Sequence, residues 1–440
     1  MANKPVYDVL IIGGGVSGTA LLYELATFTD LKHIALIEKY DSVAAVNSNG
    51  RNNSQTLHCG DIETNYSLEK ALQVKKTASM VVNYAGKLHG RDQIIFKHQK
   101  MVIGVGESEC SSLKQRFEKF SPHFTSMQFL QEQAINTIEP KVMQKRKDKV
   151  NAIAIMDEYT TVNYAALSES FVQQALTQTD KQIEVALQTY VEQIKNKNEL
   201  YTVRTNKGEY QARFVVVCAG GHSLLYAHRM GYGLDYSCLP MAGSFYYVPK
   251  QLNGKVYTVQ NDKLPFAAIH GDPDILVADK TRIGPTALVV PMLERHNLKT
   301  LPEFFQSLRF DHKVMQVFWD LLKVPDIRNY IFRNILFEVP LVRRRLFLQD
   351  ARKIIPSLRL EDICFAKGIG GVRPVMVDKP NRKLLLGEAK INTGKGIVFN
   401  MTPSPGATSC LGNAEKDMRI IADYLGCKID EENFSEEFNL

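Results

Sequence analysis

Three glycines near the N-terminus have the spacing of a dinucleotide-binding turn. Gly13, Gly15 and Gly18 follow the apolar run 6–12, and Glu38 ends the next apolar run, 20 residues after Gly18. In such a turn the first glycine makes the bend, the second lets a pyrophosphate approach the backbone, and the third lets a helix pack closely on the strand. The phosphates would lie at a helix N-terminus, and the carboxylate would bind the ribose hydroxyls. These residues predict a site for NAD or FAD.

Two later segments extend this site and favour FAD. The apolar run Phe214–Cys218 leads into Ala219-Gly220-Gly221, and Ser404-Pro405-Gly406-Ala407-Thr408 precedes a helical pattern. A helix start aimed at the pyrimidine ring of a flavin would stabilise reduced flavin through the positive end of its dipole. We therefore predict non-covalent FAD, with these residues assigned to it besides the first turn: Asn53, Ser54, Val191, Gly220, Pro405, Gly406 and Ala407.

No motif in the sequence would pass the electrons of a reduced flavin onward. There is no second G-x-G-x-x-G after a strand, and hence no NAD domain is expected. The seven cysteines are isolated, the closest pair being 17 residues apart, so no iron–sulfur, zinc or redox-disulfide spacing occurs and no metal site is predicted. The electrons must therefore go to a quinone, to oxygen or to a partner protein.

Three residues are candidates for substrate chemistry. His270 ends the strand-like segment 265–270, where an imidazole could accept the proton of an alcohol while hydride leaves for flavin N5. Arg373 lies between glycine turns, and its planar guanidinium suits a carboxylate. His58 follows the Asn-rich stretch 47–55 and is the next candidate for the base. Each has a plain structural alternative: a hydrogen-bonded core histidine, a surface arginine, or loop packing.

The elements that would position these residues indicate an α/β fold. Strands are expected at 6–12 and 34–38, a helix capped by Ser67, helical structure over 111–147, and a meander over 183–217. Further strands are expected over 236–292 and helices over 300–355. A final helix is expected over 413–425.

This order predicts a discontinuous, two-dinucleotide-motif, Rossmann-like FAD domain (1–95, 150–235 and 356–440). An antiparallel-sheet substrate domain (96–149 and 236–355) is expected to be inserted into it. The composition of the whole chain of 440 residues, of which 45% are hydrophobic and 23% charged, excludes a disordered or fibrous protein.

Charge and hydropathy suggest where the protein works. Lys and Arg exceed Asp and Glu by 54 − 47 = 7, and no apolar run is long enough for a transmembrane helix. The stretch 328–353, with Arg343, Arg344 and Arg345, mixes basic and apolar residues and could lie on an anionic membrane surface. An amphipathic core helix with a solvated basic face is the alternative. With no signal peptide evident, we expect a cytoplasmic protein peripheral on the inner face of the cell membrane.

Several of these segments together resemble one known family, the malate:quinone oxidoreductases. The resemblance covers nearly the whole chain, and its most specific parts are the Asn-rich Asn47-Ser48-Asn49-Gly50-Arg51-Asn52-Asn53 and Val162-Asn163-Tyr164; His58, the His270 segment and Ser404-Pro405-Gly406-Ala407 also contribute. It implies a membrane-peripheral FAD enzyme of the tricarboxylic acid cycle and respiratory chain. Such an enzyme oxidises (S)-malate to oxaloacetate and reduces membrane quinone.

Other functions stay open at this point. The L-2-hydroxyglutarate dehydrogenases share the pattern of a histidine followed by Gly-Pro, here His270 and Gly284-Pro285. An amino-acid or glycine oxidase would use the same flavin architecture without a membrane. A non-catalytic flavin-binding or nucleic-acid-binding protein is suggested only by the net charge, and the chain lacks an aromatic–basic RNA-binding motif, so no nucleic acid partner is expected.

Overall fold

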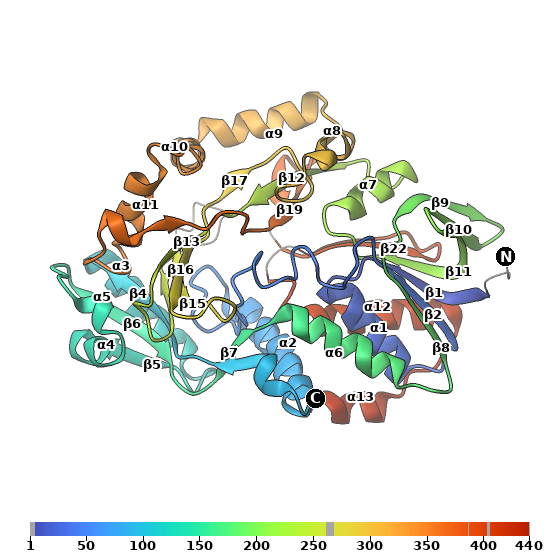
Figure 1. Cartoon of the computed structure of the whole chain (residues 1–440), viewed down its shortest axis with the longest axis horizontal. Helices are drawn as coiled ribbons and strands as arrows, with labels where there is room; N and C mark the ends of the chain where they lie inside the picture. Colours follow the sequence, from blue (N-terminus) through green and yellow to red (C-terminus); the bar gives the residue numbers. More distant parts are fainter. Residues whose placement is uncertain (1–4, 261–267, 386, 403–404, 440) are drawn as a thin grey trace.

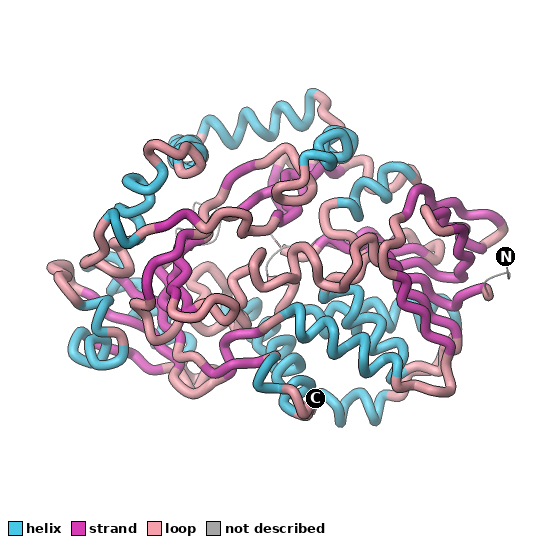
Figure 2. Tube along the Cα trace, in the orientation of Figure 1, coloured by secondary structure: helices cyan, strands magenta, loops and turns pink. Residues whose placement is uncertain are grey.

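The computed structural model describes residues 5–260, 268–385, 387–402 and 405–439. A largely parallel sheet packed against helices forms one end of the molecule, and further sheets with an outer row of helices form the other (Figures 1 and 2). The fold is therefore mixed α/β.

The parallel sheet is built from segments far apart in the sequence, which makes this part of the fold discontinuous. Its order is β21-β22-β11-β1-β2-β8, and β9 and β10 continue antiparallel from β11 as the expected meander. Pairing is parallel from β22 through β8, as expected for short apolar runs that are buried on both faces. The strands are β1 (Val6–Ile12), β2 (His33–Ile37), β8 (Gln182–Ala186), β9 (Val191–Lys197), β10 (Leu200–Thr205), β11 (Gly208–Val217), β21 (Ala389–Asn392) and β22 (Ile397–Met401).

Helices cover both faces of this sheet. On one face, α1 packs against α6 and α12, and α12 and α13 contact α2; the apolar side chains there form one core cluster. The other face packs against the meander and α7. These helices are α1 (Val16–Phe28), α2 (Leu68–Gly86), α6 (Tyr164–Leu176), α7 (His222–Arg229), α12 (Cys410–Leu425) and α13 (Glu431–Phe438). As expected, Ser67 caps α2 by accepting a hydrogen bond from the Lys70 N–H.

The second region contains two larger sheets whose pairing is antiparallel except between β4 and β14. Their orders are β18-β13-β16-β15-β14-β4-β6-β5 and β17-β12-β19-β20, and β3 pairs separately with β7. The strands are β3 (Ile95–Lys97), β4 (Lys100–Val105), β5 (Gln128–Gln131), β6 (Val150–Ile155), β7 (Tyr159–Val162), β12 (Tyr236–Ala242), β13 (Tyr246–Pro249), β14 (Lys255–Thr258), β15 (His270–Pro273), β16 (Lys280–Gly284), β17 (Leu288–Val289), β18 (Cys364–Phe365), β19 (Val372–Asp378) and β20 (Lys383–Leu385).

Further helices surround these sheets. They are α3 (Glu107–Phe120), α4 (Glu132–Ile138), α5 (Pro140–Met143), α8 (Leu301–Leu308), α9 (His312–Lys323), α10 (Pro325–Leu336) and α11 (Arg343–Ala351), with single 3-10 turns at Arg91–Gln93, Leu298–Thr300 and Leu360–Asp362. Helices α8 to α11 form the outer row at the top of Figure 1. Within the described ranges, no helix is both long and apolar enough to cross a bilayer.

Some expected elements differ from the structure. The segment 111–147 is not continuously helical, because strand β5 lies between α3 and α4 and pairs with β6. The last helix begins earlier than expected, at Cys410, and α13 follows it. The short, acidic α13 carries little apolar pattern, but its phenylalanines pack against Phe28.

The domain ranges 1–95, 150–235 and 356–440 against 96–149 and 236–355 stay a prediction. Pairing attaches 150–155 to the second region through β4 and β5, and 372–385 through β12.

Candidate active site

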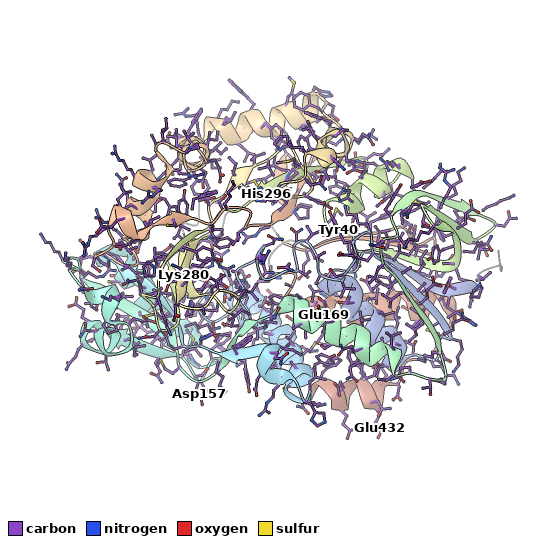
Figure 3. All side chains as sticks on the ribbon, viewed as in Figure 1. Tyr40, Asp157, Glu169, Lys280, His296 and Glu432 are labelled. Atoms are coloured by element: carbon purple, nitrogen blue, oxygen red, sulfur yellow. The ribbon has the colours of Figure 1, made fainter. Side chains whose placement is uncertain are left out.

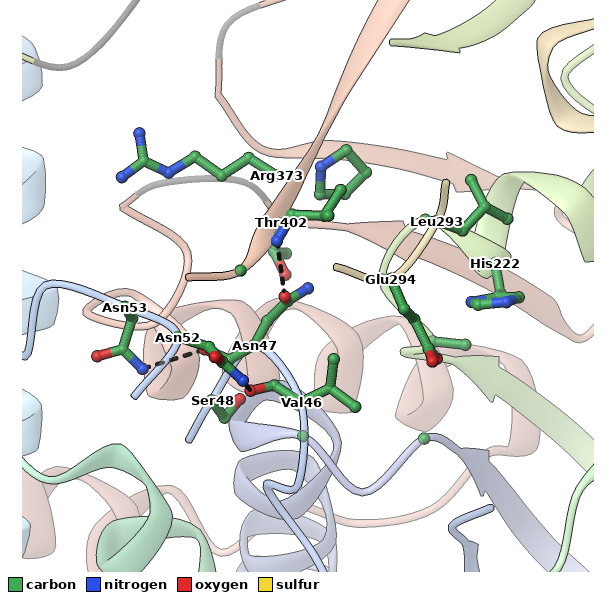
Figure 4. Close-up of a pocket in the computed structure, with 18 of the residues that line it drawn as sticks. Val46, Asn47, Ser48, Asn52, Asn53, His222, Leu293, Glu294, Arg373 and Thr402 are labelled. Atoms are coloured by element: carbon green, nitrogen blue, oxygen red, sulfur yellow. Dashed lines mark hydrogen bonds between the residues drawn. The ribbon is translucent and has the colours of Figure 1, made fainter. Parts of the chain in front are cut away.

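A cavity of about 570 Å³ lies where the parallel sheet meets the second region. Its walls come from the glycine turn after β1, the residues after β2, the Asn-rich loop, the turn after β11, and the strands β12 and β19. Figure 4 shows the Asn-rich loop, Arg373 and Glu294 around it, and Figure 3 shows Tyr40 near the centre of the molecule, whereas Glu432 on α13 lies at its outer edge. Both halves of the fold therefore contribute to one cavity.

The glycine turn has the close contacts expected of a dinucleotide motif. A Cβ on Gly13, where φ is +111°, would lie 2.5 Å from the Cys218 carbonyl oxygen, and one on Gly18 would lie 2.0 Å from the Gly13 carbonyl oxygen. Gly18 does not line the cavity; its missing side chain lets α1 pack on β1. Gly15 does line it, and the nearest atom to its added Cβ would be Ser48 Oγ at 3.3 Å. The backbone at Gly15 is thus open to a group in the cavity.

The acidic residue after β2 is buried and already partly engaged. Glu38 accepts hydrogen bonds from the Gly14 N–H (2.7 Å) and the Tyr40 N–H (2.9 Å) and lines the cavity. An ionised carboxylate has about four acceptor positions, so it can accept further donors from a ligand. Helix α1 begins at Val16, and its first turn has no acidic residue and no side-chain cap. Such a helix start can bind an anionic phosphate, so these residues fit a dinucleotide.

The Asn-rich loop is held by its own amides and joins the two halves of the cavity. Asn52 donates to the Val46 carbonyl (2.8 Å), Asn53 donates to the Asn47 carbonyl (3.0 Å), and Asn47 Oδ1 accepts from the Val372 N–H (3.0 Å). Figure 4 shows these side chains on one wall. The loop thereby fixes the start of β19.

His58 lies on the cavity wall beside a buried carboxylate. Its Nδ1 is 2.8 Å from Glu63 Oε1, and its backbone N–H donates to Thr408 Oγ. Burial acts to raise the pKa of Glu63, but the hydrogen bond with His58, together with the charges of His58 and Lys100, lowers it to about 2. Glu63 is therefore ionised near neutral pH. A carboxylate at Nδ1 leaves Nε2 as the nitrogen free to accept a proton.

Arg373 is the cation of the cavity wall on the side of β19. Arg373 lies opposite Met241 in the pairing of β19 with β12. Among the described residues, no carboxylate forms an ion pair with Arg373. Burial lowers the pKa of the guanidinium, while Tyr330, Tyr66 and Tyr257 oppose that shift. Because arginine stays protonated in proteins, a half-buried cation without a carboxylate partner among the described residues is suited to an anionic ligand.

His270, the first choice for the base, is not among the residues that line the cavity. It is 2% exposed, its ring stacks on Tyr257 with the centroids 4.5 Å apart, and its Nε2 lies 3.2 Å from Asp272 Oδ2. Tyr257 in turn shares a 2.7 Å hydrogen bond with Thr56, which does line the cavity. The position inside a sheet, between β14 and β16, accounts for this burial. The preceding 261–267, which include part of the predicted segment, lie outside the described residues.

A buried ionic network beneath the cavity was not expected from the sequence. Lys100 and Lys255 are partners in neighbouring strands and are both fully buried. Lys100 lies 2.8 Å from Asp61, and Lys255 lies 3.2 Å from Asp272. Each lysine is the first residue of its strand, where a sequence pattern indicates a solvent-facing end, so no signal predicted their burial.

Most of the other predicted cofactor residues line the cavity, and a few do not. Those that line the cavity are Gly13, Glu38, Asn53, Ser54, Val191, Gly220, Pro405 and Ala407. Gly406 does not line it, and Ser404 lies outside the described residues. Residues that the sequence did not single out, among them Tyr40, Leu293 and Glu294, complete the wall on the side of Glu38.

The fold is that of FAD-dependent oxidoreductases. The structure resembles the L-alpha-glycerophosphate oxidase from Mycoplasma pneumoniae with FAD bound, with a TM-score of 0.65, 19% identity, and coverage of 97% of this chain and 96% of the other. It also resembles glycine oxidase from Geobacillus kaustophilus, with a TM-score of 0.65, 16% identity, and coverage of 96% and 95%.

Within this class, the chain belongs to the malate:quinone oxidoreductase family, whose model matches residues 5–312. It is 51% identical to a probable malate:quinone oxidoreductase of Campylobacter jejuni over 99% of each chain, and 46% identical to the malate:quinone oxidoreductase of Helicobacter pylori over 98% of each. It is 23% identical to the mitochondrial L-2-hydroxyglutarate dehydrogenase of Bos taurus, over 93% of this chain and 87% of that one. The predicted resemblance is therefore confirmed.

Proposed function

We propose that this protein oxidises (S)-malate to oxaloacetate with FAD and passes the electrons to a membrane quinone. Membership of the family supports this activity, and one structural observation carries it furthest. The cavity that begins at the glycine turn also holds His58, paired with Glu63, and Arg373, which forms no ion pair with the described carboxylates. A dinucleotide site, a base and a carboxylate-binding cation are the groups that oxidation of a 2-hydroxy acid requires.

The cofactor would lie along the residues that fit it. Gly13, Gly15 and the start of α1 would hold the pyrophosphate, Glu38 the ribose hydroxyls, and Ala407, just before α12, the flavin end. FAD, when bound, accepts two electrons with the hydrogen from C2 of the substrate. We propose that it is bound without a covalent link.

The residues of the chain supply binding and proton transfer. Arg373 binds a malate carboxylate and fixes the orientation of C2. His58 Nε2 accepts the proton of the C2 hydroxyl, so that the C–O bond becomes a carbonyl as hydrogen leaves C2 with its electron pair. Glu63 fixes the ring orientation of His58 through its hydrogen bond with Nδ1, as the aspartate does in a Ser-His-Asp triad.

We propose His58 for this role in place of our first choice, His270. The position of His58 on the cavity wall supports it, whereas His270 is separated from the cavity by Tyr257 and Thr56. His270 would then act through Tyr257, as a positioning residue.

Two alternatives receive less support. An L-2-hydroxyglutarate dehydrogenase matches at 23% identity against 51% for the malate:quinone oxidoreductase of Campylobacter jejuni. The likeness to glycine oxidase is one of fold alone.

The acceptor distinguishes these functions in a steady-state assay. With (S)-malate as the donor, the purified protein should reduce a short-chain ubiquinone analogue at a rate far above that of peroxide formation in air. Peroxide produced as fast with glycine as the donor, and no quinone reduction with malate, would contradict the proposal.

We further propose a place for this reaction at the inner face of the cell membrane, in the tricarboxylic acid cycle and the respiratory chain. A lipid-soluble acceptor and a water-soluble donor can meet only at a membrane surface. The stretch 328–353 was the predicted contact. Within it, however, Arg343 stacks on Phe365 and Arg344 donates to the Leu360 carbonyl, so both are engaged in the fold.

A further inference from the structure

The outer helices α8 to α10 expose an unusual amount of apolar surface. In α9, Met315, Trp319 and Leu322 recur at the spacing of one helix face and are exposed, Trp319 by 63%. In α10 the exposed face carries Phe332, Ile335 and Leu336. We call these six residues the apolar ridge. Isolated exposed apolar side chains are ordinary, but six of them on two helices that contact each other indicate an interaction surface.

The opposite sides of α9 and α10 pack against the rest of the protein. Val314 and Val317 of α9 are buried, and so is Asn334 of α10, whose side chain accepts a hydrogen bond from the Ala287 N–H at 2.7 Å. The ridge is therefore a second apolar face, on helices that already have a packed one. In Figure 1, α9 and α10 lie in the outer row of helices, and all six ridge residues on them are exposed.

Cations border the ridge, while nearby acidic groups are neutralised within the fold. Arg309, Lys313 and Arg328 are exposed beside it. Asp311 pairs with Lys379 at 3.1 Å, and Asp320 pairs with Arg382 at 2.8 Å. Apolar residues near exposed cations complement an anionic bilayer, with apolar groups at the acyl boundary and cations at the headgroups.

We propose that the apolar ridge is the surface that enters the bilayer, with Trp319 at the interface. The choice of a bilayer over a protein rests on the proposed reduction of a lipid-soluble quinone. The α10 half of the ridge lies within the stretch 328–353 predicted from the sequence, whereas its α9 half lies before that stretch. Since Ala287 lines the cavity and bonds to Asn334, the same helix α10 carries the ridge on one side and borders the substrate cavity on the other.

The chain contains its own probe for this proposal. Trp319 is the single tryptophan of the 440 residues. The FAD-loaded protein should show a shift of its tryptophan emission to shorter wavelength with vesicles of phosphatidylcholine and phosphatidylglycerol, and quenching by brominated lipids. The response should be weaker with phosphatidylcholine alone. An emission spectrum unchanged by vesicles at low salt would overturn the proposal.

Substitutions identify the surface and exclude other occupants. Phe332→Gln with Ile335→Gln should lower vesicle cosedimentation at least tenfold, because the variant loses two of the six apolar side chains that would enter the bilayer. Leu176→Gln, at an equally exposed leucine of α6, is the control and should bind as the wild type does. Equal binding by the ridge variant, or a dimer in solution that this variant dissociates, would refute bilayer contact. Malate-dependent reduction in detergent, measured in parallel, tests the proposed function separately.

A separate observation concerns the end of the cavity near Glu38. Glu294, between β17 and α8, forms an ion pair with Lys39 and accepts hydrogen bonds from Tyr40 Oη (2.5 Å) and Asn297 Nδ2 (2.8 Å). Lys39 and Tyr40 directly follow Glu38, and all five residues line the cavity. The buried carboxylate of Glu294 thus connects a segment of the second region to the residues that follow β2, at the predicted adenosine end of the cavity.

We infer that this contact, the Glu294 latch, retains the cofactor after it has entered. Glu294→Gln should release FAD at least several-fold faster than the wild type, measured as recovery of flavin fluorescence after dilution. Lys39→Met should do the same if Glu294→Gln folds poorly. Glu192→Gln, which removes a surface pair with Arg204, is the control and should release FAD as the wild type does. Equal release by all of these proteins would overturn the inference.

Discussion

His58 Nδ1 lies 2.8 Å from Glu63 Oε1 on the wall of a cavity that begins at the glycine turn. Glu63 belongs to no cofactor motif, and it is buried near Lys100 and Arg116, which help to keep it ionised. The pair gives an imidazole a fixed ring orientation at the place where a substrate hydroxyl must lose its proton.

Glu63→Gln should preserve the shape of this pair and remove its charge. Loss of the carboxylate should reduce the rate of flavin reduction by malate about tenfold or more, because the imidazole loses the partner that fixes its ring and tautomer. A purely structural role for Glu63 would lower stability and leave this rate unchanged in the folded protein. Stopped-flow flavin reduction by malate measures the rate, and urea unfolding measures the stability.

Acid should also destabilise the fold through Glu63. Its pKa is about 2 in the folded protein against an ordinary value of 4.5, so the stabilisation is present above pH 4.5 and is lost as the pH falls towards 2. Urea unfolding of the wild type should show this loss, and Glu63→Gln should show a flatter dependence. Parallel curves for the two proteins would contradict the assignment.

A pair of histidine variants decides which imidazole is the base. His58→Gln should retain FAD and lose about two to four decades in the rate of flavin reduction, the usual contribution of a positioned base. His270→Gln should lose much less, since Tyr257 separates it from the cavity. The opposite order would return the role to His270.

Arg373→Ala should chiefly raise the malate concentration needed for half-maximal reduction. Loss of a charge-assisted pair of roughly 1.5–3 kcal/mol corresponds to about 10- to 150-fold. Arg373→Lys should recover part of that loss. An unchanged KM in both variants would show that another cation binds the carboxylate.

Gly15→Leu should yield folded, colourless protein. Among the described residues that do not adjoin Gly15, only Ser48 Oγ lies within 4 Å of the missing Cβ, so a large side chain would enter the cavity and block the backbone from a pyrophosphate. Gly86→Ala, whose added Cβ would have no described atom within 4 Å beyond its chain neighbours and its own helix backbone, is the control and should stay yellow. Stoichiometric FAD in Gly15→Leu would contradict the cofactor placement.

Local patterns predicted the parts of the fold that depend on neighbours in sequence. The run 6–12, the glycine turn and the capping Ser67 each fix a nearby backbone conformation, and the structure has them where expected. The helical prediction for 111–147 failed because β5 is stabilised by β6, a partner distant in sequence.

The site residues could likewise be predicted only where neighbours in sequence marked them. Arg373 and His58 were named from their flanking glycines and asparagines. Glu63 and the buried Lys100 and Lys255 were missed, because burial of a charge depends on partners that the fold brings close, such as Asp61 for Lys100 and Asp272 for Lys255. His270 has the sequence context of a strand end, and only the structure shows that it stacks on Tyr257 and is not among the residues that line the cavity.

Anaerobic mixing of the FAD-loaded protein with (S)-malate tests the central claim most directly. The account predicts that the flavin bleaches within the time of a turnover, that 2-hydroxyglutarate and glycine leave it oxidised, and that a short-chain ubiquinone then restores its colour. A flavin that stays oxidised with malate and bleaches with 2-hydroxyglutarate or glycine would contradict it.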